Sequence, residues 1–186
     1  NYCFEFGANT PYPITDGEVL FFHVDNCWPG GDPRTIGYWK NWSTCSGGNQ
    51  ASNAAANGGP SNGWYILDDI LNYPGISWCN FTIDSCETGV SILDKRDVVS
   101  GRKKASDPAY NLASQLLAAQ LNFSAGARIC DSAQIAAAQG VALLCNIGFD
   151  GTGDYKPKGG GGKPKGGNNG GGNTAMTQAQ ANQANQ

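Results

Sequence analysis

The chain has 186 residues, a length that accommodates about one domain with additional segments. Its formal net charge of −3 is unevenly placed: residues 1–150 hold 14 acids against eight bases, net −6, whereas residues 151–186 hold Asp154 and four lysines, net +3. The acidic body argues against a nucleic-acid partner, and no apolar stretch is long enough to span a membrane.

Residues 1–31 have the pattern of β-strands. Tyr2, Phe4 and Phe6 alternate with polar or small residues, and EVLFFHVD, 18–25, is apolar almost throughout. Turn residues separate the two runs, which indicates a hairpin-like pair. Two strands are not stable by themselves, so this pair needs the rest of the chain or a neighbouring chain.

The stretch RTIGYWKNWSTC, residues 34–45, places Tyr38, Trp39 and Trp42 within five residues. With Trp64, these residues form an aromatic motif with two interpretations. The first is a short helix whose rings pack into a small core, and the second is a platform on which sugar rings stack. We favour the core and expect Trp39 and Trp64 to be buried.

The middle of the chain alternates loops with short elements. We expect a polar, glycine-rich loop over 46–63, then a helix in WYILDDILNY, 64–73, capped by Ser61 or Asn62 and ended by Pro74. VSIL, 90–93, is assigned to a strand. KRDVVSGRKK, 95–104, is assigned to a solvated, charged loop.

Two longer helices are predicted in the second half. The first covers 107–122, with Asp107 as N-cap, Pro108 at the first helical position, and an apolar stripe made of Ala109, Leu112, Ala113, Leu116, Leu117 and Leu121. The second covers 132–144 and is rich in alanine.

The composition changes after Phe149. Eleven of residues 151–172 are glycine and KPKGG occurs twice, so we expect a linker that does not fold alone. Residues 173–186 are polar and uncharged. We expect them to leave their own domain and add as a strand to a sheet edge of a neighbouring copy, an edge that the N-terminal strands could offer.

Seven cysteines are scattered along the chain without a CxxC pair, and with one histidine a zinc site is disfavoured. We expect a disulfide framework formed in an oxidising compartment, with candidates Cys27, Cys45, Cys79, Cys86, Cys130 and Cys145. The pairs expected are Cys79–Cys86 and Cys27–Cys45, and Cys3 is the expected odd thiol. Cys130 and Cys145 flank a helix of roughly 20 Å, so each should pair elsewhere.

Three sequons, at Asn41, Asn80 and Asn122, are expected to be exposed glycan acceptors. Asn122 has an alternative, because it ends an apolar helix and could instead be a buried C-cap. Together with the cysteines they indicate the mature form of an exported protein, located extracellularly or at the cell surface.

Other chemistry-bearing residues are assigned structural roles. His23 lies in an apolar strand, and the adjacent Asp68 and Asp69 point in different directions on a helix. The acids Asp84, Glu87, Asp94 and Asp97 are clustered in sequence, which leaves a calcium site open, although no EF-hand pattern is present. We therefore expect no catalytic residue, cofactor or metal.

The segment Gly37-Tyr38-Trp39-Lys40-Asn41 resembles the GYWKxH-type motif of secreted bacterial and archaeal surface proteins. In that family a His usually follows the Lys-Asn or Lys-Thr pair, where this chain has Trp42. The match continues in LASQLLAAQLNFSAGA, 112–127, which is similar to the family's leucine- and alanine-rich helix, and covers about residues 34–147. The resemblance implies an exported, often cell-surface protein, and it carries over no established chemistry.

The fold class predicted is α+β: a small disulfide-stapled domain with an N-terminal hairpin-like segment, three or four short helices and a glycine-rich tail. The segments expected are 1–31, 32–150, 151–172 and 173–186. The function we favour is a non-catalytic extracellular structural protein, a subunit of a filament or matrix whose partners are copies of itself. A glycan-binding module using exposed tryptophans is the alternative, and an enzyme is the third class.

Overall fold

The computed structural model describes residues 32–72, 74–156 and 176–184. The chain divides into two units, 1–30 and 31–186, and all described residues belong to the second. The strands predicted within 1–31, with His23, Cys3 and Cys27, lie outside the described residues.

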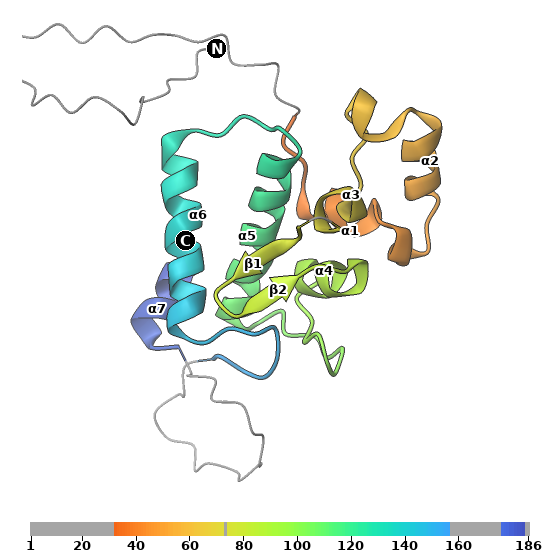
Figure 1. Ribbon diagram of the computed structural model, residues 1–186. Helices are drawn as coiled ribbons and strands as arrows, with labels where there is room; N and C mark the ends of the chain where they lie inside the picture. The colour runs from red at the N-terminus through yellow and green to blue at the C-terminus, as the bar shows by residue number, and fades with distance from the viewer. Residues whose placement is uncertain (1–31, 73, 157–175, 185–186) are drawn as a thin grey trace, which may run out of the picture. The chain divides into compact units, whose positions relative to one another are not determined.

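Helices and one antiparallel hairpin make up the described residues, which confirms the α+β class (Figure 1). The hairpin pairs Ile76 with Ile83 and Trp78 with Phe81, and it was not predicted. The elements are α1 (Ile36–Asn41), η1 (Thr44–Ser46), α2 (Gln50–Ala56), η2 (Gly59–Asn62), α3 (Leu67–Leu71), β1 (Ile76–Trp78), β2 (Phe81–Ile83), α4 (Cys86–Leu93), α5 (Pro108–Ser124), α6 (Asp131–Asn146) and α7 (Gln178–Ala184).

Helix α5 is the centre of this unit, because α1, α3, α4, α6 and α7 all contact it. Its start is as predicted: Pro108 opens the helix and the Asp107 carboxylate accepts the Ala109 N–H at 3.0 Å. The predicted apolar stripe is buried, apart from the half-buried Leu112. Helix α6, predicted at 132–144, lies alongside α5 (Figure 1).

The strand predicted at 90–93 is wrong, since these residues belong to α4. Ser85 caps this helix by accepting the Thr88 N–H at 3.3 Å. A four-residue apolar run fits a strand and a buried helix equally well, so periodicity could not separate them. Helix α4 packs tightly on α3 at Gly89, where a Cβ would lie 2.6 Å from Leu71 Cδ1.

The segment before α4 also differs from expectation. The loop predicted at 46–63 contains α2 and the 3₁₀ turn η2, and η1 ends at its first residue. Helix α3 begins at Leu67, three residues later than predicted, and its first turn is closed by Asp69, which accepts the Ile66 N–H at 2.8 Å, rather than by Ser61 or Asn62.

The chain after α6 returns to the core. Phe149 and Tyr155 are buried among Trp78, Phe81 and Tyr110. Gly151 has φ +79°, and a Cβ there would lie 2.8 Å from Phe81 Cζ, so this crossing requires glycine. The packed core thus continues to Tyr155, inside the segment expected to be a linker.

The C-terminal segment folds against its own unit, contrary to expectation. Residues 178–184 form helix α7, which contacts α5 and α6, and Met176 and Ala181 are 2% and 4% exposed. Thr177 and Gln180 close the first turn reciprocally, with Thr177 N–H donating to Gln180 Oε1 at 2.8 Å and Gln180 N–H donating to Thr177 Oγ1 at 3.2 Å. This is a capping box, which favours a helix over an added strand.

The disulfides connect different cysteines from those predicted. Cys45 is bonded to Cys86, and Cys79 to Cys145, with Cα–Cα distances of 6.0 and 5.7 Å. The predicted pairs Cys79–Cys86 and Cys27–Cys45 are therefore wrong. Cys130 was expected to be paired, but its thiol is free and exposed at the start of α6.

The double substitution of Cys79 and Cys145 by Ser is expected to destabilise the protein by up to about 4 kcal/mol, because this disulfide closes a long loop with a sequence separation of 66. Urea unfolding under oxidising conditions measures the effect. Cys130→Ser is the control, since it removes an exposed free thiol. Equal unfolding free energies for the double variant and the native chain would contradict a stabilising bridge.

Candidate functional site

Helix α1 carries the aromatic motif, and it sends Trp39 into the core. The Trp39 side chain is fully buried, as predicted. Its indole N–H donates to the Asn122 side-chain oxygen at 3.0 Å. An indole in a core needs such an acceptor, so Trp39 and Asn122 are a matched pair.

Asn122 does more than accept this bond. Its Oδ1 also accepts the Arg34 backbone N–H at 2.8 Å, and its Nδ2 donates to the Arg34 carbonyl at 2.9 Å. The Asn122 side chain is 9% exposed. The prediction that Asn122 is an exposed glycan acceptor is therefore wrong, because the nitrogen that would carry a glycan is buried and already engaged.

The remaining aromatic residues form a stack, which we call the aromatic ladder: Tyr38, Trp42 and Trp64. Tyr38 and Trp42 stack with ring centroids 4.9 Å apart at 14°, and Trp42 and Trp64 at 5.4 Å and 26°. All three are half-buried, so Trp64 is less buried than predicted.

The ladder is closed at the Tyr38 end by Arg34. The guanidinium carbon lies 4.3 Å from the Tyr38 ring centroid, and Nη2 donates to the Gly63 carbonyl at 2.9 Å. The Tyr38 hydroxyl donates to the Tyr65 carbonyl at 2.6 Å. The faces of Tyr38 and Trp42 are thus covered by protein groups rather than lying side by side as a flat platform.

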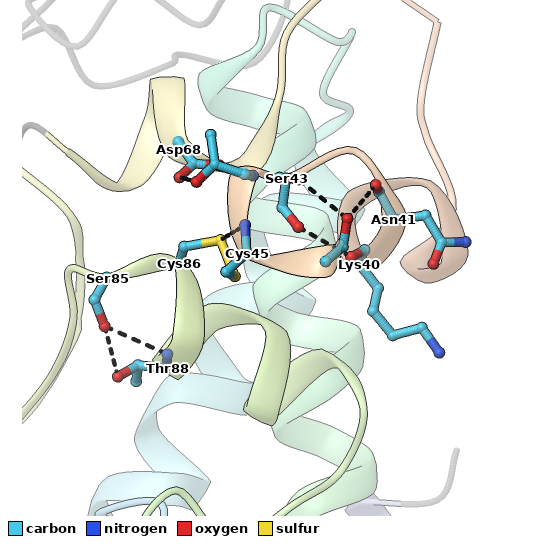
Figure 2. Close-up of a disulfide and its surroundings, with 10 residues drawn as sticks. Lys40, Asn41, Ser43, Cys45, Asp68, Ser85, Cys86 and Thr88 are labelled. Carbon is cyan, nitrogen blue, oxygen red and sulfur yellow. Dashed lines mark hydrogen bonds between the residues drawn. A yellow bond between two sulfur atoms is a disulfide. The ribbon is translucent and has the colours of Figure 1, made fainter. Parts of the chain in front are cut away.

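Figure 2 shows the surroundings of the Cys45–Cys86 disulfide. Asp68 accepts the Thr44 N–H at 2.9 Å, while the exposed Asp69 serves the start of α3, so the two adjacent carboxylates have separate partners, as predicted. The Asn41 side chain points away from the disulfide and is exposed, and Asn80 is exposed at the tip of the hairpin. Glycosylation of these two residues stays a prediction.

Asp94, just beyond α4, is surrounded by three cations. Its carboxylate lies 3.2 Å from Lys40 Nζ, 2.6 Å from Arg96 Nε and 2.8 Å from Lys103 Nζ. Burial by itself would raise the pKa of Asp94, but the hydrogen bonds from Lys103, Arg96 and Lys40 outweigh it and lower the pKa to about 2. The Asp94 carboxylate is therefore ionised at neutral pH, and it binds one cation that precedes α4 in the chain and two that follow it.

The buried carboxylates of Asp97 and Asp107 accept hydrogen bonds from main-chain N–H groups. Asp97 accepts the N–H groups of Ser100 and Gly153, each at 2.8 Å, and these bonds lower its pKa although burial opposes them. Asp107 accepts the Tyr155 N–H at 2.8 Å, and burial raises its pKa. Burial also raises the pKa of the Tyr110 and Tyr155 hydroxyls, so both stay protonated.

The calcium site left open by the sequence does not form at the four acids named. Asp84 and Glu87 lie at the start of α4, whereas Asp94 follows its end and binds cations. Among residues 32–72, 74–156 and 176–184, no three His, Cys, Asp or Glu side chains are grouped to hold a metal. Within the same ranges no helix has the length and apolarity needed to cross a membrane.

All six buried polar side chains of the described residues bond to main-chain groups: Ser43, Asp68, Asp97, Asp107, Ser114 and Asn122. Their chemistry is therefore used to hold loops and helix ends. Sequence reasoning identified Asp107 from its position before Pro108, and for Asn122 it favoured an exposed glycan acceptor over the buried C-cap that it also considered. A sequon in the last turn of an apolar helix is the signal for a buried amide.

Comparison with known proteins finds no matching family model, curated protein or solved structure. The resemblance to the GYWKxH-type family stays an expectation based on the two motifs. The position where that family has His is occupied by the middle ring of the aromatic ladder, Trp42.

Asp94→Asn is expected to reduce the loss of stability in acid. A carboxyl group whose folded pKa is about 2 contributes stability above its unfolded pKa of about 4, and this contribution is lost as the pH falls from about 4 toward 2. We expect the variant to lose about 1–2 kcal/mol at pH 7, after allowance for the exposure of the three cations, and much less at pH 2. Unfolding free energies measured from pH 7 to pH 2 test this.

The exposed Asp84 provides the matched control. Asp84→Asn should retain the native pH profile. A parallel pH profile for Asp94→Asn and the native chain would show that the cations around Asp94 contribute nothing.

Proposed function

We propose that this chain is a non-catalytic extracellular structural protein that assembles with copies of itself through its C-terminal segment. The observation that carries the proposal is the docking of residues 176–184 on α5 and α6. A segment that binds a folded surface at the end of a glycine-rich connection can bind the same surface on another copy.

The docking contacts are small and specific. Met176 is the main apolar anchor, and its N–H donates to the Tyr155 carbonyl at 3.0 Å. Ala181 and the half-buried Ala184 continue the contact at helical spacing. The apolar contact comes from three side chains, Met176, Ala181 and Ala184, so we expect the segment to be released and exchanged.

The connection has the length needed for exchange. The 19 residues 157–175 include nine glycines, two prolines and three lysines, so glycine is the commonest residue. A glycine-rich coil of that length has a root-mean-square span of about 24 Å. Docking within one copy is favoured at low concentration, and docking between copies competes at the high local concentration of a surface layer.

Other features of the described residues support a structural role. The six buried polar side chains hold the main chain, and two disulfides brace the domain. Disulfides form in oxidising compartments, which supports an extracellular location. The covered ring faces of Tyr38 and Trp42 leave no row of open rings for a sugar, which favours self-assembly over glycan binding.

A chain ending at Lys156 tests the proposal as an assembly terminator. It keeps the docking surface of α5 and α6 and lacks the segment that occupies it, so it should add to an assembly once and stop further addition. We expect the full chain to form concentration-dependent oligomers by light scattering, and a small fraction of the shortened chain to reduce their size.

Met176→Leu is the matched control for Met176→Ser. The first keeps an apolar anchor and should assemble normally, whereas the second should assemble weakly. A full chain that stays monomeric at millimolar concentration, or oligomers whose size ignores the shortened chain, would refute assembly through this segment.

A further inference from the structure

We infer that the loop 95–104 is a docking surface for a second copy of the chain, and that it binds the acidic end of α4 on that copy. The inference rests on the proposed self-assembly and adds to it a second contact, distinct from α7. We call residues 95–104 the basic loop.

The basic loop concentrates the positive charge of the folded unit. It holds five bases and one acid, net +4, whereas the rest of residues 32–150 holds three bases and nine acids, net −6. Some of this charge is used locally, since Arg96 and Lys103 bind Asp94 and Lys104 binds Asp154 at 2.7 Å. Arg102 is exposed next to the tip.

The basic loop is held in one shape. Arg96 pairs with Lys103 as an isolated β-bridge, and the Lys104 N–H donates to the Lys95 carbonyl at 2.7 Å. The Asp97 carboxylate accepts from the N–H groups of Val99 and Ser100 at 3.1 and 2.8 Å. Arg96 Nη1 donates to the Gly101 carbonyl at 3.0 Å, which closes the tip.

This framework presents an apolar side chain to solvent. Val99 is 82% exposed, although a buried carboxylate and a tight network of main-chain bonds hold its backbone. A side chain held ready in this way loses little conformational entropy when it binds, which favours a contact residue. Val99 beside Arg102 is therefore an apolar anchor next to a charge that selects an acidic partner.

An acidic surface that complements the basic loop lies at the other end of α4. Asp84 and Glu87 lie on either side of Cys86 at the start of α4. Asp69 follows Asp68, whose carboxylate accepts the Thr44 N–H. Thr44 precedes Cys45, the disulfide partner of Cys86. Asp69, Asp84 and Glu87 are all exposed. Helix α4, about 12 Å long, thus separates an acidic end from the basic loop.

A second copy is the occupant that these observations favour. The two surfaces are different and of opposite charge, so contact between copies is heterologous, and it builds a ring or an open filament according to the rotation between copies. A lipid surface would satisfy the cations, but one valine supplies about 1.5–3 kcal/mol at most, which is little for membrane insertion.

Variants of the full chain test the contact by sedimentation and light scattering. Val99→Ser should weaken self-association about tenfold, and raising NaCl from about 50 to 500 mM should weaken it further, because the charges are exposed. Ile135→Ser is the matched control, since Ile135 is also an exposed apolar residue, at 58%, but belongs to α6 and not to the basic loop.

Charge reversal tests the partner surface directly. Arg102→Glu and Glu87→Arg should each weaken self-association, and a mixture of the two variants should regain it, because the reversed charges then meet across the contact. Circular dichroism confirms that both variants are folded.

The outcomes separate this inference from the proposed function. Oligomers that respond to the chain ending at Lys156 but not to Val99→Ser, Arg102→Glu or Glu87→Arg would overturn the basic-loop contact and leave assembly through α7 intact. A native chain that never associates would remove both. Loss of pelleting with phosphatidylglycerol vesicles in Val99→Ser, with self-association unchanged, would assign the loop to a membrane and overturn the second copy as its partner.

Discussion

Two buried side chains at opposite ends of α5 hold the two ends of the segment 34–155. Asn122, in the last turn, binds the backbone N–H and carbonyl of Arg34, close to the start of the described residues. Asp107, at the N-cap, binds the Tyr155 N–H, close to the end of the described range 74–156. Because α5 is covered by helices on several sides, these bonds fasten both chain ends to the most buried element.

This arrangement explains how the polar residues are used. A domain with short helices and a two-stranded hairpin has little regular structure to satisfy its loops, so buried carboxylates and amides take over that task. The exposed charges form two separate groups at the ends of α4, the acidic residues at its start and the basic loop after its end. The domain is thus internally braced, and the two binding surfaces that we propose, the α7 docking surface and the basic loop, lie outside this bracing.

The long elements could be predicted from the sequence, and the long-range connections could not. Helix α5 and its Asp107–Pro108 start follow from a strong apolar period and a local cap. The disulfide partners of Cys79 and Cys86 depend on how α4, α6 and the hairpin pack, which spacing does not encode. Helix α7 was not predicted, although Thr177 and Gln180 form a capping-box pattern. The polar composition of residues 173–186 was given more weight than this local capping signal.

Native-state hydrogen exchange of the Arg34 and Tyr155 amides tests the central claim most directly. If Asn122 and Asp107 fasten both ends of the domain to α5, these two amides exchange only through global unfolding, with the same protection free energy as the amides in the middle of α5. Exchange of either amide through a local opening, several kcal/mol below global unfolding while α5 stays protected, would contradict the account.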